Sequence, residues 1–206
     1  FLLKQEVKLL IIACNTMAAV AHQAVKDLSP VPVLDVIEAG AQTAVAHTRT
    51  KSIGVIGTMA TINSNAYARA IHTRDPSIRI FSQACPLFVP LVEEGWWDHE
   101  VTRLTALEYL RPVLAEDIDA LVLGCTHYPL LKALLKDLVG PGIQLVDSAE
   151  AMASITAELL AGMNLANPNH AVPDYQFYVT DVPLRFRHIG EHFLGRTMPN
   201  VQVVKL

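Results

Sequence analysis

Short apolar runs alternate with longer helical patterns along almost the whole chain. The runs KLLIIA (8–13), SIGVIG (52–57) and ALVLG (120–124) lack the polar and apolar alternation of a half-exposed strand. Such runs are typical of strands that are buried on both faces of a sheet. The stretches between them have the 3.6-residue spacing of helices that cover a sheet. The sequence therefore predicts βαβ units and an α/β fold with mainly parallel sheets, in which ligands collect at the carboxyl ends of the strands.

The pattern sets the expected elements. We expect eight strands, at Val7–Ala13, Val31–Val36, Ser52–Ile56, Ile78–Gln83, Ala120–Leu123, Ile143–Asp147, Phe177–Thr180 and Val201–Val204. We expect helices at Thr16–Asp27, Ile37–His47, Ala60–Arg74, Val101–Ala115, Leu130–Leu138, Ala149–Leu160 and Pro183–Leu194. Composition alone predicts no domain boundary.

Charge and hydropathy exclude several function classes. The net charge is -4, and no basic cluster is longer than Arg185, Arg187 and His188, so we expect no nucleic acid or anionic membrane as a partner. The longest wholly apolar run, Leu9–Cys14, is far shorter than the roughly 20 residues of a membrane-spanning helix. An odd count of three scattered cysteines indicates a reducing cytoplasm rather than a disulfide framework. Small molecules or other proteins are the expected partners.

Two of the cysteines occupy matching places. Cys14 and Cys125 each follow a buried strand and precede a helical segment, where free backbone N–H groups and the helix dipole favour a thiolate. Hydrogen-bonding residues come next in both cases, Asn15 and Thr16 after the first cysteine, and Thr126 and His127 after the second. Two such thiols facing each other suit inversion at a carbon with an exchangeable proton, because one removes the proton while the other delivers one to the opposite face.

Other interpretations of these residues remain open. A cysteine at a strand end can be a small buried hydrophobe, and Cys85, in QACPLF, fits that role. Cys125 with His127 could belong to a metal site, although no further ligand pattern accompanies them, or could form a Cys–His nucleophilic pair. GVIG (54–57) is only a fragment of a dinucleotide-binding pattern.

Five segments resemble, in order, the motifs of the bacterial glutamate racemases in the aspartate/glutamate racemase family. They are IIACNTMAA, VIGTMATINS, CPLFVPLVEEG, LVLGCTHYPLL and FYVTDVPLRFRHIGEHFLG, and they span essentially the whole chain. The resemblance implies an isomerase that interconverts L- and D-glutamate without a cofactor or metal, by a two-base mechanism. It also implies a supply of D-glutamate for peptidoglycan, cell wall biogenesis and cell shape, a cytoplasmic homodimer, and two doubly wound α/β domains with a cleft between them.

The resemblance also implies roles for individual residues. Cys14 and Cys125 match the two catalytic acid/base cysteines. Substrate-binding positions match Asn15, Thr16, Thr126 and His127. Auxiliary acid/base positions match His127 and Glu93, although Glu93 could equally be a solvated carboxylate at the start of a helix. Thr58 and Thr61 match positions that line the same pocket.

Domain boundaries follow from the resemblance as well. Residues 1–36 and 148–206 should form the first domain, and residues 37–147 should form an inserted second domain. Family members begin with an Asp-Ser-Gly motif followed by a Pro-Tyr-Gly motif, and neither is in this sequence. We therefore expect a first domain that lacks its N-terminal part. A second hypothesis follows, a truncated, non-catalytic protein of the same fold that binds an amino acid or has a regulatory role.

Overall fold

The computed structural model describes residues 1–168 and 173–205, in which every strand pairing is parallel. The strands are β1 (Leu10–Ile12), β2 (Val33–Asp35), β3 (Ser52–Gly57), β4 (Arg79–Ala84), β5 (Ala120–Gly124), β6 (Gln144–Val146), β7 (Phe177–Val179) and β8 (Val201–Val203). The helices are α1 (Asn15–Leu28), α2 (Val36–His47), α3 (Met59–Asn63), α4 (Ala66–Arg74), α5 (Phe88–Glu93), α6 (Glu100–Leu114), α7 (Lys132–Val139), α8 (Ala149–Gly162) and α9 (Pro183–Leu194). Two 3₁₀ helices are η1 (Leu2–Gln5) and η2 (Tyr128–Leu131). None of the helices in these residues is long and apolar enough to cross a membrane.

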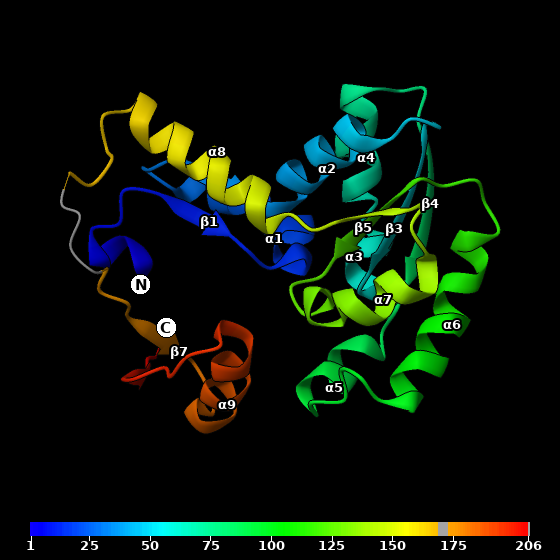
Figure 1. The fold of residues 1–206 in the computed structure, drawn as a ribbon. Helices are drawn as coiled ribbons and strands as arrows, with labels where there is room; N and C mark the ends of the chain where they lie inside the picture. The colour runs from blue at the N-terminus through cyan, green and yellow to red at the C-terminus, as the bar shows by residue number, and fades with distance from the viewer. Residues whose placement is uncertain (169–172, 206) are drawn as a thin grey trace.

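The largest sheet has the strand order β4-β3-β5-β6. Its central strands β3 and β5 are buried along their whole length, because apolar side chains alternate between two covered faces. Ile53 and Val55 pack in one core cluster with residues of α2 and α4. Ile56 and Leu121 pack in a second cluster with residues of α6 and α7. Figure 1 shows α2 and α4 on one side of this sheet and α6 on the other.

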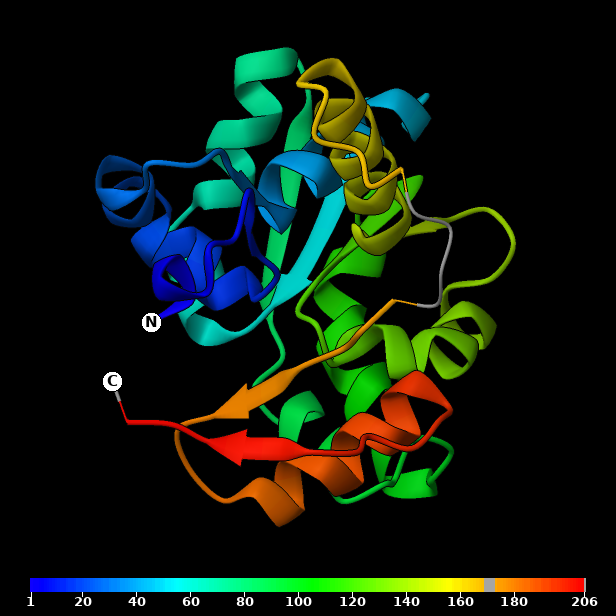
Figure 2. The same ribbon diagram turned by 90° about the vertical axis from the view of Figure 1, so that its left-hand side faces the viewer.

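Two further strand pairs lie outside this sheet. β1 pairs with β2, and β7 pairs with β8. Figure 2 shows β7 and β8 side by side, next to α9, in the lower part of the molecule. Helix α8 packs on the upper part, where Met152 is buried in the same cluster as residues of α2. The chain thus leaves the β1–β2 region, builds the large sheet, and returns through α8 to β7, α9 and β8.

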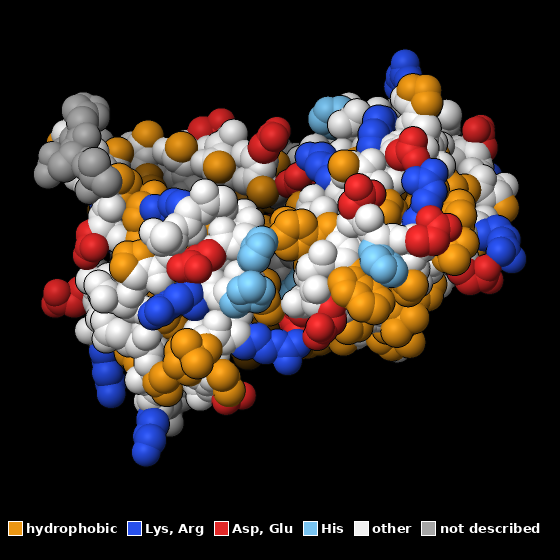
Figure 3. Space-filling model, turned by 60° about the horizontal axis from the view of Figure 1, so that its bottom comes forward, with side chains coloured by type: hydrophobic (Ala, Val, Ile, Leu, Met, Phe, Trp, Pro, Cys, Tyr) orange, Lys and Arg blue, Asp and Glu red, His pale blue; other side chains and the backbone are white. Residues whose placement is uncertain are grey.

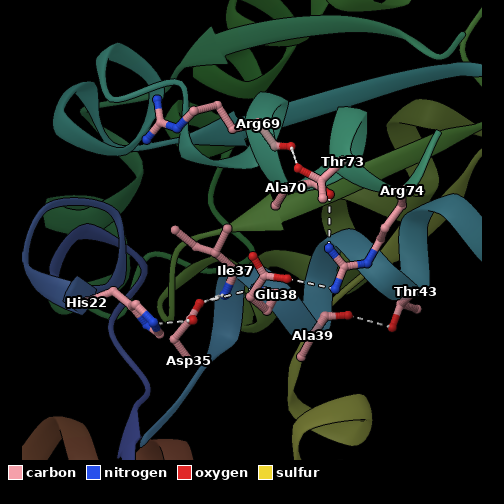
Figure 4. A network of polar contacts seen from close by, with 10 residues as sticks. All are labelled: His22, Asp35, Ile37, Glu38, Ala39, Thr43, Arg69, Ala70, Thr73 and Arg74. Atoms are coloured by element: carbon pink, nitrogen blue, oxygen red, sulfur yellow. Dashed lines mark hydrogen bonds and ion pairs between the residues drawn. The ribbon is translucent and has the colours of Figure 1, made fainter. Parts of the chain in front are cut away.

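A network of polar contacts fixes α1 and α4 around the start of α2 (Figure 4). Asp35 caps α2 by accepting hydrogen bonds from the backbone N–H groups of Ile37 and Glu38, at 2.8 and 3.1 Å. The other oxygen of this buried carboxylate lies 2.8 Å from Nδ1 of His22 in α1. Glu38 pairs with Arg74 of α4 at 2.7 Å. These contacts tie α1 to the start of α2, and α2 to α4.

The structure confirms the predicted strands, corrects two predicted helices and adds a helix that was not predicted. The predicted helix Ala60–Arg74 is wrong as a single element, because Asn65 has a left-handed backbone, with φ of 55°, and separates α3 from α4. The predicted helix Leu130–Leu138 begins within the 3₁₀ helix η2 before α7 starts. Helix α5 was not predicted at all, since it is short and contains Pro90.

Candidate active site

Cys14 lies at the point where β1 ends and α1 begins. It is the N-cap residue of α1, with φ of -82° and ψ of 120°, and its thiol is exposed. The next residue, Asn15, is almost fully buried, and its side-chain oxygen accepts a 2.6 Å hydrogen bond from the hydroxyl of Tyr67 in α4. This bond fixes the orientation of the Asn15 amide, so the NH₂ group remains as a donor beside Cys14.

Three threonine hydroxyls connect this turn to the carboxyl end of β3. Thr16 Oγ1 lies 2.8 Å from Thr58 Oγ1 and 3.4 Å from Thr61 Oγ1, and the last two atoms are 3.0 Å apart. Thr58 also caps α3, because its hydroxyl accepts the backbone N–H of Thr61 at 3.2 Å. The structure therefore brings together the three threonines that the family resemblance assigned to one pocket.

Cys125 follows Gly124, the last residue of β5, which is paired with Gly57 of β3. The close packing of these strand ends requires glycine, since a Cβ on Gly124 would lie 2.7 Å from the carbonyl oxygen of Ile56. The chain then turns, and the N–H of Tyr128 donates to the carbonyl of Cys125 at 3.2 Å. The second predicted thiol thus stands at the carboxyl end of a central strand, next to Thr58 along the same sheet edge.

The electrostatics at Cys125 correct one sequence-based expectation. We expected the strand-to-helix turn to favour a thiolate, but burial raises the pKa of the Cys125 thiol from 9.0 to about 11. The backbone N–H groups of His127 and Tyr128 and the Thr126 hydroxyl lower this pKa, and burial outweighs them. Negative charge on Cys14 raises the pKa of Cys125 further.

His127 lies between Cys125 and a carboxylate. Its Nδ1 atom is 3.8 Å from Cys125 Sγ and 3.4 Å from Thr126 Oγ1, and its Nε2 atom is 3.3 Å from Oε1 of Glu93. Glu93 is the last residue of α5, so the alternative of a carboxylate at a helix start is wrong. Its other oxygen, Oε2, accepts a 2.6 Å hydrogen bond from Nη2 of Arg185 in α9. Sequence reasoning gave no site role to Arg185 or Tyr67, because each meets its partner only through the tertiary fold.

A cavity of about 430 Å³ lies beside this cluster. Glu93, Thr126 and His127 line it together with residues of β7 and α9, including Phe177 and Phe186. Figure 3 shows the lower face of the molecule, where Lys or Arg side chains lie next to Asp or Glu side chains near its centre. The cavity is therefore lined by two distant parts of the chain, residues 93–130 and residues 177–198.

The third cysteine has a different environment. Cys85 is fully buried in the cluster around Phe88, and burial raises its pKa to about 12. This matches the packing role predicted for it. No group of three or more His, Cys, Asp and Glu side chains that could hold a metal ion occurs within residues 1–168 and 173–205.

Comparisons with known proteins agree on one family. Residues 2–156 match the family model described as Asp/Glu/Hydantoin racemase. The chain is 74% identical over 206 residues to a glutamate racemase from Syntrophus aciditrophicus, and 57% identical over 207 residues to one from Neisseria meningitidis serogroup A. In both cases the whole chain is matched to 76% of the relative.

Solved structures give the same result. The fold matches a crystal structure of glutamate racemase from Francisella tularensis in complex with D-glutamate, with a TM-score of 0.92 and 42% identity. It also matches glutamate racemase isoform RacE1 from Bacillus anthracis, with a TM-score of 0.94 and 37% identity. All of this chain is covered in both cases, with 76% of the first structure and 77% of the second.

Proposed function

Because the chain belongs to the Asp/Glu/hydantoin racemase family, we propose that it is an isomerase that interconverts L- and D-glutamate. Relatives named glutamate racemase match its whole length, and one of them is 74% identical. The observation that carries the proposal is the pair of thiols Cys14 and Cys125, each of which follows the carboxyl end of a strand, and negative charge on the first raises the pKa of the second. Neither the metal nor the dinucleotide alternative has a comparable set of residues in the described part of the chain.

The proposed reaction moves one proton at each face of the substrate α-carbon. One cysteine, as a thiolate, forms an S–H bond with the α-hydrogen, and the electron pair of the broken C–H bond passes to the substrate carboxylate. The other cysteine, as a thiol, then delivers its proton to the opposite face. The raised pKa of Cys125 keeps this thiol protonated in the empty site, which suits it to the donating role for one enantiomer. The reverse reaction exchanges the two roles.

Polar groups at the strand ends would stabilise the charge that develops on the substrate. Free N–H groups at the start of α1 lie next to Cys14, and the NH₂ group of Asn15 is fixed by Tyr67. We propose that these donors, with the hydroxyls of Thr16 and Thr126, bind the substrate carboxylates. Preorganised donors of this kind need no rearrangement when charge develops, so they favour the transition state.

His127 and Glu93 would assist Cys125. Nδ1 of His127 lies 3.8 Å from the Cys125 sulfur, and Glu93 contacts the far nitrogen of the His127 ring. A carboxylate at this nitrogen fixes the orientation of an imidazole, as it does in other acid–base sites. We propose that the two residues set the proton affinity of Cys125 during turnover.

The remaining expectations belong to the same proposal. Residues 1–36 and 148–206 would form one domain and residues 37–147 the other, with the cavity beside His127 between them. The small β1–β2 and β7–β8 sheets fall in the first of these segments, and the four-stranded sheet falls in the second. A cytoplasmic homodimer that supplies D-glutamate for peptidoglycan stays a prediction, and size-exclusion chromatography with light scattering would test the dimer.

The activity can be tested by incubating the purified protein with L-glutamate and separating the enantiomers by chiral chromatography. We expect D-glutamate to accumulate until the two enantiomers are equal. Cys14→Ser and Cys125→Ser should each abolish this conversion, and Cys85→Ala, which alters a thiol outside the site, should retain it. Glutamate binding without any conversion would instead support the non-catalytic hypothesis. Normal conversion in either serine variant would contradict the two-base mechanism.

A further inference from the structure

Arg185 ends a chain of polar contacts that begins at the Cys125 thiol. The sulfur of Cys125 lies 3.8 Å from Nδ1 of His127, and Nε2 of His127 lies 3.3 Å from Oε1 of Glu93. Nη2 of Arg185 donates to Oε2 of Glu93 at 2.6 Å. The two oxygens of one carboxylate therefore have different partners, the ring of His127 on one side and a guanidinium from α9 on the other.

The exposure of this ion pair indicates what it does. The side chain of Arg185 is 62% exposed and that of Glu93 is 26% exposed, so the pair adds little to the free energy of folding. The ion pair does, however, restrict the orientation of Glu93, because a carboxylate that is held through one oxygen by a charged donor cannot rotate freely. Holding Oε2 fixes the direction of Oε1, which is the atom that contacts His127.

The position of Arg185 connects this contact to the wall of the cavity. Arg185 belongs to α9, and the same helix supplies the apolar side chains of Phe186, Ile189 and Phe193 to the cavity. A second contact ties α9 to the segment after α5, where the rings of Trp97 and His192 meet edge to face with centroids 5.3 Å apart. Helix α9 therefore contacts α5 through Glu93 and the segment after α5 through Trp97.

We propose that Arg185 is a positioning residue, which couples the seating of α9 over the cavity to proton transfer at Cys125. When α9 is seated, Arg185 holds Glu93 against His127, and His127 lies beside the Cys125 sulfur. When α9 moves away, Glu93 loses this constraint and His127 loses its fixed orientation. The inference rests on the proposed racemase activity, and it assigns to Arg185 an effect that acts only through Glu93.

Kinetics of four variants test the inference. Arg185→Gln should lower kcat for glutamate racemisation by about tenfold, a part of what a complete acid–base group contributes, with a change in KM of about twofold or less. Arg185→Lys, which keeps a charge able to reach Glu93, should restore part of the loss. Glu93→Gln should lower kcat at least as much as Arg185→Gln, and the double variant should be no slower than Glu93→Gln alone.

A matched control and an isotope effect separate positioning from structure. Arg111→Gln removes an exposed ion pair with Glu108 on α6, away from the cavity, and should leave kcat unchanged. With α-deuterated glutamate, Arg185→Gln should increase the kinetic isotope effect more for the enantiomer whose proton Cys125 removes. A structural defect would change both enantiomers alike. A kcat within twofold of wild type, or losses that multiply in the double variant, would overturn the inference.

A measurement without substrate distinguishes failure of this inference from failure of the proposed function. The alkylation rate of Cys125 by iodoacetamide should fall severalfold in Arg185→Gln, because His127 is no longer held beside the sulfur. The rate at Cys85 should not change, and neither should either rate in Arg111→Gln. An unchanged Cys125 rate would overturn the role of Arg185 even if wild-type protein fails to racemise glutamate.

Discussion

Without substrate, the three cysteines should be alkylated by iodoacetamide at different rates, because their surroundings differ. Burial raises the pKa of Cys125 from 9.0 to about 11, which lowers its thiolate fraction at neutral pH about 100-fold. A thiolate of higher pKa is intrinsically more nucleophilic, with a Brønsted coefficient of about 0.4–0.5. This raises the rate constant of the Cys125 thiolate roughly tenfold and so offsets a part of the 100-fold loss in thiolate fraction. Cys125 should therefore react about tenfold more slowly than an unperturbed thiol.

The assay is peptide mapping by mass spectrometry after timed alkylation between pH 7 and pH 11. The rate at Cys125 should rise tenfold per pH unit up to about pH 10, since the pKa lies near 11. Cys85, fully buried with a pKa of about 12, should react more slowly still, and the exposed Cys14 should react first. If the Cys125 rate levels off at or below pH 9, burial does not control this thiol and the reasoning is refuted.

Three further predictions concern stability, each measured by urea denaturation. Tyr67→Phe should cost about 1–3 kcal/mol, because the buried Asn15 oxygen loses its donor; an unchanged midpoint would show that the bond contributes nothing. Gly54→Ala should cost about 1–3 kcal/mol, since its Cβ would lie 2.7 Å from Val113 Cγ1, and wild-type stability would mean that the core adapts. Above pH 9 the unfolded chain ionises Cys85 while the folded protein keeps it protonated up to about pH 12, so stability falls with rising pH. The loss of unfolding free energy that Cys85 causes should reach about 1.4 kcal/mol at pH 10. It should be absent in Cys85→Ala, and an identical pH dependence of stability in that variant would contradict the prediction.

The fold was largely predictable because its central strands are buried on both faces. Continuous apolar runs such as Ser52–Gly57 and Ala120–Gly124 have few other structural solutions, and the structure places both at the centre of the sheet. Local backbone exceptions escaped prediction. The left-handed conformation of Asn65 interrupts an otherwise regular helical pattern, and α5 forms despite Pro90.

The sequence pattern alone identifies only candidate site residues that adjoin a strand end, whereas Glu93, at the end of α5, was named from the family resemblance. Cys14 and Cys125 stand in recognisable turns, and His127 follows in the same motif. Arg185 lies 92 positions from Glu93, and Tyr67 lies 52 positions from Asn15, so only the tertiary fold brings these partners together. The pKa of Cys125 also escaped prediction, because it depends on how much of the thiol the surrounding core covers.

Racemisation of L-glutamate in heavy water, stopped before a tenth of the substrate is converted, tests the two-thiol mechanism most directly. In the proposed mechanism the donating thiol exchanges its hydrogen with solvent before substrate binds, and a different thiol removes the substrate proton. We therefore predict that the D-glutamate formed carries deuterium at the α-carbon while the remaining L-glutamate carries none. D-glutamate that retains the original hydrogen, or deuterium that accumulates in the remaining L-glutamate, would show that one group serves both faces and would contradict the paired roles of Cys14 and Cys125.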